Sequence, residues 1–415
     1  MIRLTGDNAA NWLADRLHGS AGRVFVTGGA AEPVLFANAF AQAPETAAGL
    51  TFLGAWIPGA NRTDWAALGA GAEGTFVSAD WRQSFEAGRF LFRPITWSQT
   101  RTWLATTPMD AGLFQVSPPD ADGMCSLGIS VDFQTSALPR AILKLAHINP
   151  AMPAPRNGIK VPLDAFDAVV EAEMPLPSYD AGTLDPAFEA IKGHITTLTP
   201  DRAHLQFGLG KAGVAALAGM RGRPGLNIHS GMVSDPLIHL LDEDTIDAVT
   251  CGMALGSAEL HAKAAADRRV TFVDASRTHD IRALAQVPRL VAVNSALEVD
   301  LYGQANAERL DGRQISGIGG LTDFLKGARL SEGGVPIVAL NATAKGGTLS
   351  RIVPQLTSGT VSVSRHDIGV VVTEYGIADL RDLPLDARAQ ALIAVAAPQH
   401  RDALANEWDA MRRRM

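Results

Sequence analysis

The sequence contains little cysteine and no long apolar segment. Only two of its 415 residues are cysteines, Cys125 and Cys251, and neither belongs to a Cys or His pair with the spacing of a metal site. This scarcity excludes a zinc site built on thiolates and argues against a disulfide framework. No uninterrupted apolar run approaches the roughly 20 residues that a membrane-spanning helix needs, so we expect no membrane partner.

Metal-binding and strongly basic patterns are also missing. The ten histidines show no HExxH or similar spacing, so no metal site is expected. The formal net charge is −7, which disfavours binding to nucleic acid and requires any anion to be held by a local cluster of donors. The N-terminal segment MIRLTGDNAANWLADRL lacks the apolar core of a signal peptide, and we therefore expect a cytoplasmic protein.

The sequence does contain a regular alternation of two kinds of segment. Short runs rich in Val, Ile, Leu and Phe alternate with Ala-rich helical stretches, which is typical of βαβ units around a mostly parallel sheet. The length exceeds that of one ordinary core. We therefore predict an α/β protein with two domains, 1–185 and 186–415, divided at the Pro-rich segment 173–186.

Strands in the first domain are predicted over 24–27, 51–57, 75–78, 113–117 and 142–149. Those in the second are predicted over 204–207, 226–229, 248–253, 270–273, 290–294, 336–340 and 370–373. The predicted helices include 33–42, 186–197, 214–220, 387–396 and a final helix over 401–415. The first domain contains Trp56, Trp65, Trp81, Trp97 and Trp103, which either line an acyl pocket or form the core.

The loop 208–213 reads GLGKAG between a predicted strand and a predicted helix. This is the GxGxxG pattern of dinucleotide-binding folds and would fit an NAD-linked oxidoreductase. Such a site needs an acid at the end of the next strand to hold the ribose, but that strand ends LNIH and Asp235 lies too far into the following turn. We favour a tight strand-to-helix turn and keep the oxidoreductase as an alternative.

Two further segments carry groups suited to a site. In 316–324, the glycines Gly317, Gly319 and Gly320 precede a predicted helix that contains Asp323, so backbone N–H groups there are able to hold a phosphate or an oxyanion; the alternative is a plain helix start capped by Asp323. In 294–304, Glu298 and Asp300 alternate on a predicted strand and share a face. Either they belong to a site or they hydrogen-bond within the loop.

The order of four motifs resembles a known family. They are NSALEVDLYGQANAE (294–308), SGIGGLTDFLKGA (316–328), ATAKGGTLSRIVP (342–354) and VVTEYGIADLRDLPLDARAQALI (371–393). Weaker matches lie upstream at VSPPDADGMCSLGISVDF (116–133), INPAMP (148–153) and LQFGLGKAG (205–213). Together they resemble the acetyl-CoA hydrolase/transferase family, class I CoA-transferases that include 4-hydroxybutyrate and acetate CoA-transferases.

The resemblance implies two related α/β domains with the active site in the cleft between them. It implies transfer of CoA from an acyl-CoA to a small carboxylate, with CoA as a substrate, no permanently bound cofactor, and a homo-oligomeric assembly. In the implied cycle a glutamate attacks the thioester carbonyl to give a mixed anhydride and free CoA thiolate. The thiolate then gives a glutamyl-CoA thioester, from which the incoming carboxylate takes over the CoA.

The resemblance also assigns roles to residues. Gly319 is the expected oxyanion donor, and the loop 27–33 is a second source of such donors. Gly317, Gly320, Asp323 and Lys345 are the expected CoA-binding residues, with Arg351 as a further partner for CoA phosphates. Lys345 and Arg351 are alternatively solvated surface charges.

The chain departs from the family at the expected nucleophile. Relatives carry glutamate in a His-Thr-Glu-Met segment, where this sequence has His229-Ser230-Gly231-Met232. Three interpretations follow. Glu298 acts as nucleophile or general base, which we favour; or the site transfers or hydrolyses without a glutamyl intermediate; or the protein binds CoA esters without turnover. Acyl-CoA hydrolysis at the same site is the main alternative activity.

Overall fold

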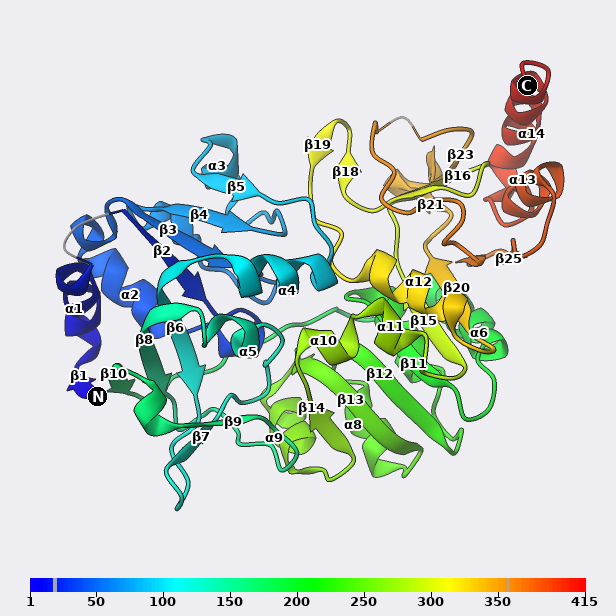
Figure 1. Ribbon diagram of the computed structural model, residues 1–415. Coiled ribbons are helices and arrows are strands. Elements are labelled where there is room, and N and C mark those ends of the chain that lie inside the picture. Colours follow the sequence, from blue (N-terminus) through cyan, green and yellow to red (C-terminus); the bar gives the residue numbers. More distant parts are fainter. Residues whose placement is uncertain (18–20, 357) are drawn as a thin grey trace. The chain divides into compact units, whose positions relative to one another are not determined.

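The computed structural model describes residues 1–17, 21–356 and 358–415, which pack as two compact units (Figure 1). The first unit comprises Met1–Asp180, Gly231–Ile238 and Val249–Thr278, and the second comprises Ala181–Ser230, His239–Ala248 and His279–Met415. The predicted division at residue 185 lies close to Asp180. The segments 231–238 and 249–278 nevertheless pack with the first unit, although they follow that division in the sequence.

The first unit contains an eight-stranded sheet in which every pair is parallel, in the order β1-β10-β8-β6-β2-β3-β4-β5. Its strands are β1 (Ile2–Leu4), β2 (Gly22–Val26), β3 (Leu50–Gly54), β4 (Gly71–Gly74), β5 (Phe90–Phe92), β6 (Met109–Val116), β8 (Ala141–Ile148) and β10 (Ala168–Glu171). A hairpin pairs β7 (Met124–Ser126) with β9 (Lys160–Pro162). The helices are α1 (Ala9–Arg16), α2 (Val34–Gln42), α3 (Arg82–Glu86), α4 (Trp97–Thr106) and α5 (Gln134–Ala137). Helices α2 and α4 lie on opposite sides of the sheet (Figure 1).

A second eight-stranded sheet has the order β14-β13-β12-β11-β15-β20-β24-β25. Its strands are β11 (His204–Phe207), β12 (Leu226–Val233), β13 (Ile246–Ala254), β14 (Val270–Phe272), β15 (Leu290–Asn294), β20 (Val335–Ala339), β24 (Val370–Thr373) and the antiparallel edge strand β25 (Gly376–Asp379). Strands β12 and β13 each begin in the second unit and end in the first.

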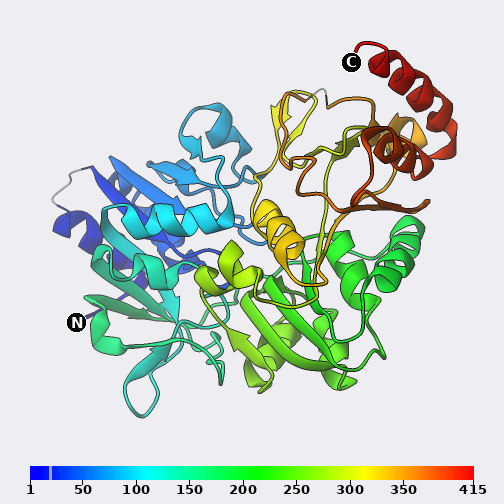
Figure 2. The same cartoon turned by 45° about the vertical axis from the view of Figure 1, so that its right-hand side comes forward.

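The second half of the chain also contains helices and several small strands outside that sheet. The helices are α6 (Pro186–Leu198), α7 (Lys211–Ala218), α8 (Leu237–Asp242), α9 (Ala258–Ala266), α10 (Ala275–Thr278), α11 (Ile281–Leu284), α12 (Leu321–Leu330), α13 (Leu385–Ala394) and α14 (Pro398–Arg412). The small strands are β16 (Glu298–Asp300), β17 (Ala305–Asn306), β18 (Arg309–Leu310), β19 (Arg313–Gln314), β21 (Thr343–Ala344), β22 (Leu349–Ser350) and β23 (Ile352–Val353). Helices α13 and α14, at the red end of the chain, pack against each other (Figure 2).

Apolar strands explain why both sheets form. All five residues of β15 are buried, as expected for a parallel strand with helices on both faces, and α12 packs against β15 and β20. In the first unit, aromatic side chains build the core: the ring of Phe52 lies 5.0 Å from that of Trp65, which stacks on Trp56. Trp56, Trp65 and Trp81 are therefore core residues.

The predicted α/β class with mostly parallel sheets and flanking helices is confirmed. The predicted strands 204–207, 290–294 and 370–373 coincide with β11, β15 and β24. The strand predicted over 75–78 is wrong, because the strand in that region is β4 and ends at Gly74. The sequence of β4, GAEG, has low strand propensity, and its pairing with β3 and β5 holds it extended. No helix in the described part of the chain has the length and apolar character of a membrane span.

Candidate functional site

A glycine loop follows β2 at the carboxyl end of the first sheet, where parallel α/β folds bind ligands. Gly29 has a φ of +62°, and a Cβ there would lie 2.4 Å from the Ser130 hydroxyl oxygen, so the position requires glycine. The Ser130 hydroxyl donates to the Gly28 carbonyl at 3.0 Å. The loop is thus held close to the segment that leads into α5.

Asn61 fixes the same loop from the other side. Its Oδ1 accepts from the backbone N–H groups of Gly29 and Ile57 at 2.9 and 2.7 Å. Its Nδ2 donates to the Gly29 carbonyl and to the Glu32 carboxylate, each at 2.9 Å. Asn61 is fully buried, and these bonds use the hydrogen-bonding capacity of its amide. The loop is therefore rigidly positioned.

The buried carboxyl group of Glu32 completes this network. It also accepts from the Trp65 indole N–H at 2.9 Å. Burial raises the pKa of Glu32 to about 7, and the hydrogen bonds from Trp65 and Asn61 oppose that rise. Glu32 therefore changes protonation near neutral pH without contacting solvent.

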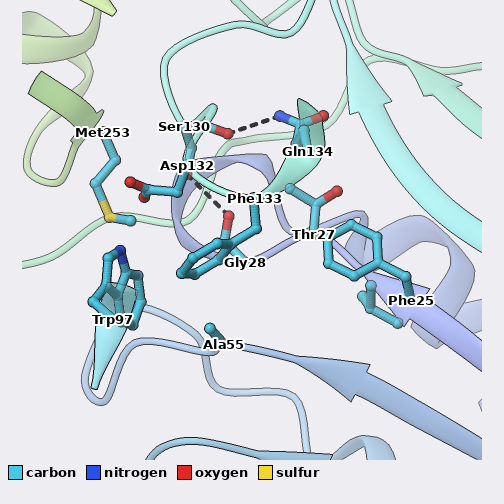
Figure 3. A pocket seen from close by; sticks show the side chains of 11 residues that line it. Phe25, Thr27, Gly28, Ala55, Trp97, Ser130, Asp132, Phe133, Gln134 and Met253 are labelled. Carbon is cyan, nitrogen blue, oxygen red and sulfur yellow. Dashed lines mark hydrogen bonds between the residues drawn. The ribbon is translucent and has the colours of Figure 1, made fainter. Parts of the chain in front are cut away.

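A pocket lies beside the glycine loop (Figure 3). Its lining residues are Phe25, Val26, Thr27, Gly28, Ala55, Trp97, Ser130, Asp132, Phe133, Gln134 and Met253. The space in it that admits the centre of a water molecule is about 10 Å³, which is room for about one water. All of these residues belong to the first unit.

Asp132 is the ionisable residue of that lining. It is 4% exposed, and among the described residues neither carboxylate oxygen has a hydrogen bond of normal geometry. Burial raises the pKa of Asp132 to about 8, and the charge of Asp274 adds to the rise, while the indole N–H of Trp97 lowers it. Asp132 is therefore a neutral carboxylic acid at pH 7.

The carboxyl group of Asp132 lies against Gly252 of β13. A Cβ on Gly252 would meet Asp132 Oδ1 at 2.0 Å and the Gly231 carbonyl oxygen at 2.9 Å. Asp132 and Gly231 therefore approach the same point of β13. Gly231 is the position where the resemblance leads us to expect the family's glutamate, and the first unit brings the Asp132 carboxyl group to this neighbourhood.

In the second unit, the glycines 317–320 lead into α12. Gly317 and Gly319 are buried, Gly319 with a φ of +54°. A Cβ on Gly320 would lie 2.6 Å from the His279 ring, and this ring in turn packs on Phe324. Helix α12 begins at a glycine that offers no side-chain cap, and the Leu321 N–H donates to the Ile318 carbonyl at 3.3 Å.

Asp323 occupies the first turn of α12 and is 2% exposed. It does not cap the helix, because the cap position is Gly320. A buried acid in a first turn complements the helix dipole. The expectation that Asp323 contacts CoA stays a prediction.

The GLGKAG loop forms a strand-to-helix turn. Gly210 has a φ of +90° at the start of α7, and a Cβ on Gly213 would meet the Gly208 carbonyl oxygen at 2.1 Å. Lys211 pairs with Asp185 at 2.9 Å. Beside the loop, Asn294 at the end of β15 donates to Gln206 at 2.8 Å. These contacts account for the glycines without a dinucleotide.

Glu298 and Asp300 lie on β16, in a three-stranded sheet with β17 and β23. Glu298 is partly exposed and accepts from Asn306 Nδ2 at 3.0 Å. Asp300 is fully buried and accepts from the backbone N–H groups of Tyr302 and Gln304. Asp300 therefore holds the loop, whereas Glu298 keeps part of its surface free.

The other predicted CoA-binding residue, Lys345, is exposed and lies 3.8 Å from Asp311. Strand β16 and helix α12 contribute Val299 and Phe324 to one core, so the glycines 317–320, Asp323 and Glu298 belong to one packed body.

Two residues of the pocket and the glycine loop, Asp132 and Asn61, were not predicted from the sequence. Asp132 lies in the weakly matching motif 116–133, but its place in the pocket depends on contacts with β13 and α4.

The chain was compared with known proteins. The sequence model of the "Acetyl-CoA hydrolase/transferase C-terminal domain" matches residues 256–408. The 4-hydroxybutyrate coenzyme A transferase of Clostridium kluyveri is 33% identical over 345 residues, 80% of each protein. RipA from Yersinia pestis has a TM-score of 0.89 at 25% identity, over 99% of this chain and 98% of that one. The 4-hydroxybutyrate CoA-transferase of Porphyromonas gingivalis has a TM-score of 0.81 at 27% identity, over 100% and 98%.

Proposed function

Because the chain belongs to the acetyl-CoA hydrolase/transferase family, we propose that it moves CoA between small carboxylic acids, with acetyl-CoA or 4-hydroxybutyryl-CoA as donor. The observation that carries this proposal is the 33% identity to a 4-hydroxybutyrate CoA-transferase over 80% of both chains. CoA enters and leaves as a substrate, and no cofactor stays bound. The protein works in the cytoplasm as a homo-oligomer, without a nucleic-acid or membrane partner.

The proposed reaction uses the groups described above. The backbone N–H groups around Gly319 stabilise the oxyanion that forms at the thioester carbonyl. Gly317, Gly320, Asp323 and Lys345 hold the CoA. Glu298 is the proposed carboxylate nucleophile or general base, and its partial exposure and single bond to Asn306 support that role.

Hydrolysis of acyl-CoA at the same site is a second candidate function. It is favoured by Gly231, which puts no side chain where the family carries its glutamate. Without that carboxylate, water is able to reach the activated carbonyl in place of an acceptor acid. Both activities start from an acyl-CoA donor. In transfer a carboxylate receives the CoA, whereas in hydrolysis water receives the acyl group.

The test is to incubate the protein with acetyl-CoA and a panel of carboxylates that includes 4-hydroxybutyrate, and to follow every CoA species by mass spectrometry. Transfer predicts new acyl-CoAs with little free CoA. Free CoA that accumulates regardless of the acceptor would establish hydrolysis instead. Binding of acetyl-CoA without turnover across the panel would contradict both.

Glu298→Gln tests the proposed nucleophile in the same assay, since the amide keeps the size of the side chain and loses its nucleophilicity. We expect turnover to fall by at least about 100-fold. The exposed residue Glu332 provides a control, and Glu332→Gln should keep full activity. Unchanged turnover in Glu298→Gln would remove Glu298 from the chemistry.

A further inference from the structure

We propose that the pocket around Asp132 is a subsite for one oxygen atom of a short-chain carboxylate, and that Asp132 holds this oxygen as a protonated, hydrogen-bond-donating carboxyl group. This inference rests on the proposed function, because it assigns the place where the small acid binds. It does not make Asp132 the nucleophile, and no covalent bond to Asp132 forms.

The first argument is the unmet hydrogen-bonding capacity of Asp132. The side chain is 4% exposed, and both of its oxygens lack a hydrogen bond of normal geometry. A buried polar group without a partner is costly to the folded state. In Figure 3 the carboxyl group points into the region between Met253 and Trp97, and the indole nitrogen of Trp97 is turned toward it. A ligand oxygen placed there would relieve the cost.

The second argument is the size and character of the pocket. It has room for about one water molecule, which is the size of one carboxylate oxygen. Phe25, Val26, Ala55, Phe133 and Met253 supply apolar walls, so that Asp132 is the polar group that an oxygen atom in this space would meet. In the part of the chain that the structure describes, no Lys, Arg or His lines the pocket. A phosphate dianion would therefore find no positive charge there, whereas a carboxylate is able to share the proton of Asp132.

The third argument is that the surroundings keep Asp132 neutral. Asp274, at the start of α10, faces it and disfavours its ionisation. Arg101 of α4 forms an ion pair with Asp274, with 4.0 Å between Arg101 Nε and Asp274 Oδ1, rather than with Asp132. From β13, the buried thiol of Cys251 is neutral. A neutral carboxylic acid in an apolar site is an effective donor to an anionic oxygen.

The proposal predicts how binding depends on pH. When Asp132 loses its proton, two negative charges occupy one apolar pocket and repel each other. Carboxylate affinity should be constant up to about pH 7 and should fall about tenfold per pH unit above the pKa of about 8.

The experiment is a titration of the intact protein with acetate and with propionate by calorimetry between pH 6 and 9.5. The key variant is Asp132→Asn, which keeps a neutral donor at the same place; we expect it to bind the acids with no fall at high pH. Asp132→Leu keeps the volume without a donor and should bind at least about tenfold more weakly at pH 6. Asp274→Asn removes the facing charge and should move the fall to lower pH. Near-ultraviolet circular dichroism checks that each variant is folded.

Two results would overturn the subsite: an affinity that is flat across the pH range in the unmodified protein, or a fall that persists in Asp132→Asn. CoA transfer is assayed in parallel at pH 7. Transfer without the pH-dependent binding would refute the subsite and leave the proposed function standing. The pH-dependent binding without transfer would refute the proposed function and leave the subsite.

Discussion

Asn61 and Gly29 exchange two hydrogen bonds: the Gly29 N–H donates to Asn61 Oδ1, and Asn61 Nδ2 donates to the Gly29 carbonyl, both at 2.9 Å. One side chain thereby satisfies both backbone groups of a residue in the left-handed region. The glycine loop beside the Asp132 pocket therefore owes its geometry to Asn61, which lies on the connection between β3 and β4.

Asn61→Ala should therefore destabilise the protein strongly. The substitution leaves the backbone N–H groups of Gly29 and Ile57 buried without their acceptor, and we expect a loss of about 2 to 4 kcal/mol. Urea unfolding followed by tryptophan fluorescence measures it. Asn8 is exposed and makes no side-chain capping bond, so Asn8→Ala should change stability by less than about 0.5 kcal/mol. Equal effects of the two variants would contradict the role of Asn61.

Glu32 should make stability depend on pH. Its pKa rises from 4.5 to about 7 on folding, so its contribution is fully present below pH 4.5 and is lost as pH rises through 7. The free energy of unfolding should fall over that window with a slope of up to about 1.4 kcal/mol per pH unit from this group. Because the pKa of Asp132 is also raised on folding, to about 8, Asp132 should lower the free energy of unfolding further as the pH rises toward 8.

Urea unfolding between pH 4.5 and 8 checks this dependence. Glu32→Gln should flatten the slope below pH 7. The exposed residue Glu86 gives the control, and Glu86→Gln should leave the slope as it is. A slope that survives in Glu32→Gln would mean that other groups cause it.

Gly252→Ala should be costly because the new Cβ would meet Asp132 Oδ1 at 2.0 Å. We expect a loss of about 1 to 3 kcal/mol from overpacking. In an Asp132→Ala background the same change should cost at least about 0.5 kcal/mol less, because the clashing oxygen is gone. Gly193 in α6 has open space around it, and Gly193→Ala should instead stabilise the helix. Thermal unfolding of this set measures the coupling, and additive effects would contradict the contact.

The two thiols should react only when the protein unfolds. Cys125 and Cys251 are both fully buried. Burial raises the pKa of Cys125 to about 11, with a smaller contribution from Asp120, and raises the pKa of Cys251 still further. An Ellman assay at pH 8 should find no fast-reacting thiol in the native protein and both thiols in denaturant. Rapid native labelling of either cysteine would show that its surroundings open readily.

The sequence predicted the sheets better than the pocket. Strands such as β15 are recognisable because parallel strands covered on both faces are continuously apolar, whereas β4 is strand only through its neighbours. The glycines 317–320 and Glu298 follow from motifs that are local in the chain. Asp132 has no local signature, because the surroundings of its carboxyl group are formed by Gly252 of β13 and Trp97 of α4. The sequence alone does not show that these residues, which are far apart in the chain, come into contact.

The division of the chain has a consequence for biosynthesis. Within the first unit, Val131 N–H donates to the Gly252 carbonyl, Ala254 N–H donates to the Ile129 carbonyl, and Ala275 N–H donates to the Asp132 carbonyl. A ribosome that has released only residues 1–185 has not yet made any of these partners. The segment 129–132 must therefore wait, with the Asp132 carboxylate hydrated and charged, while the second unit begins to emerge. Uptake of the proton by Asp132 is thus among the late steps in the maturation of the nascent chain.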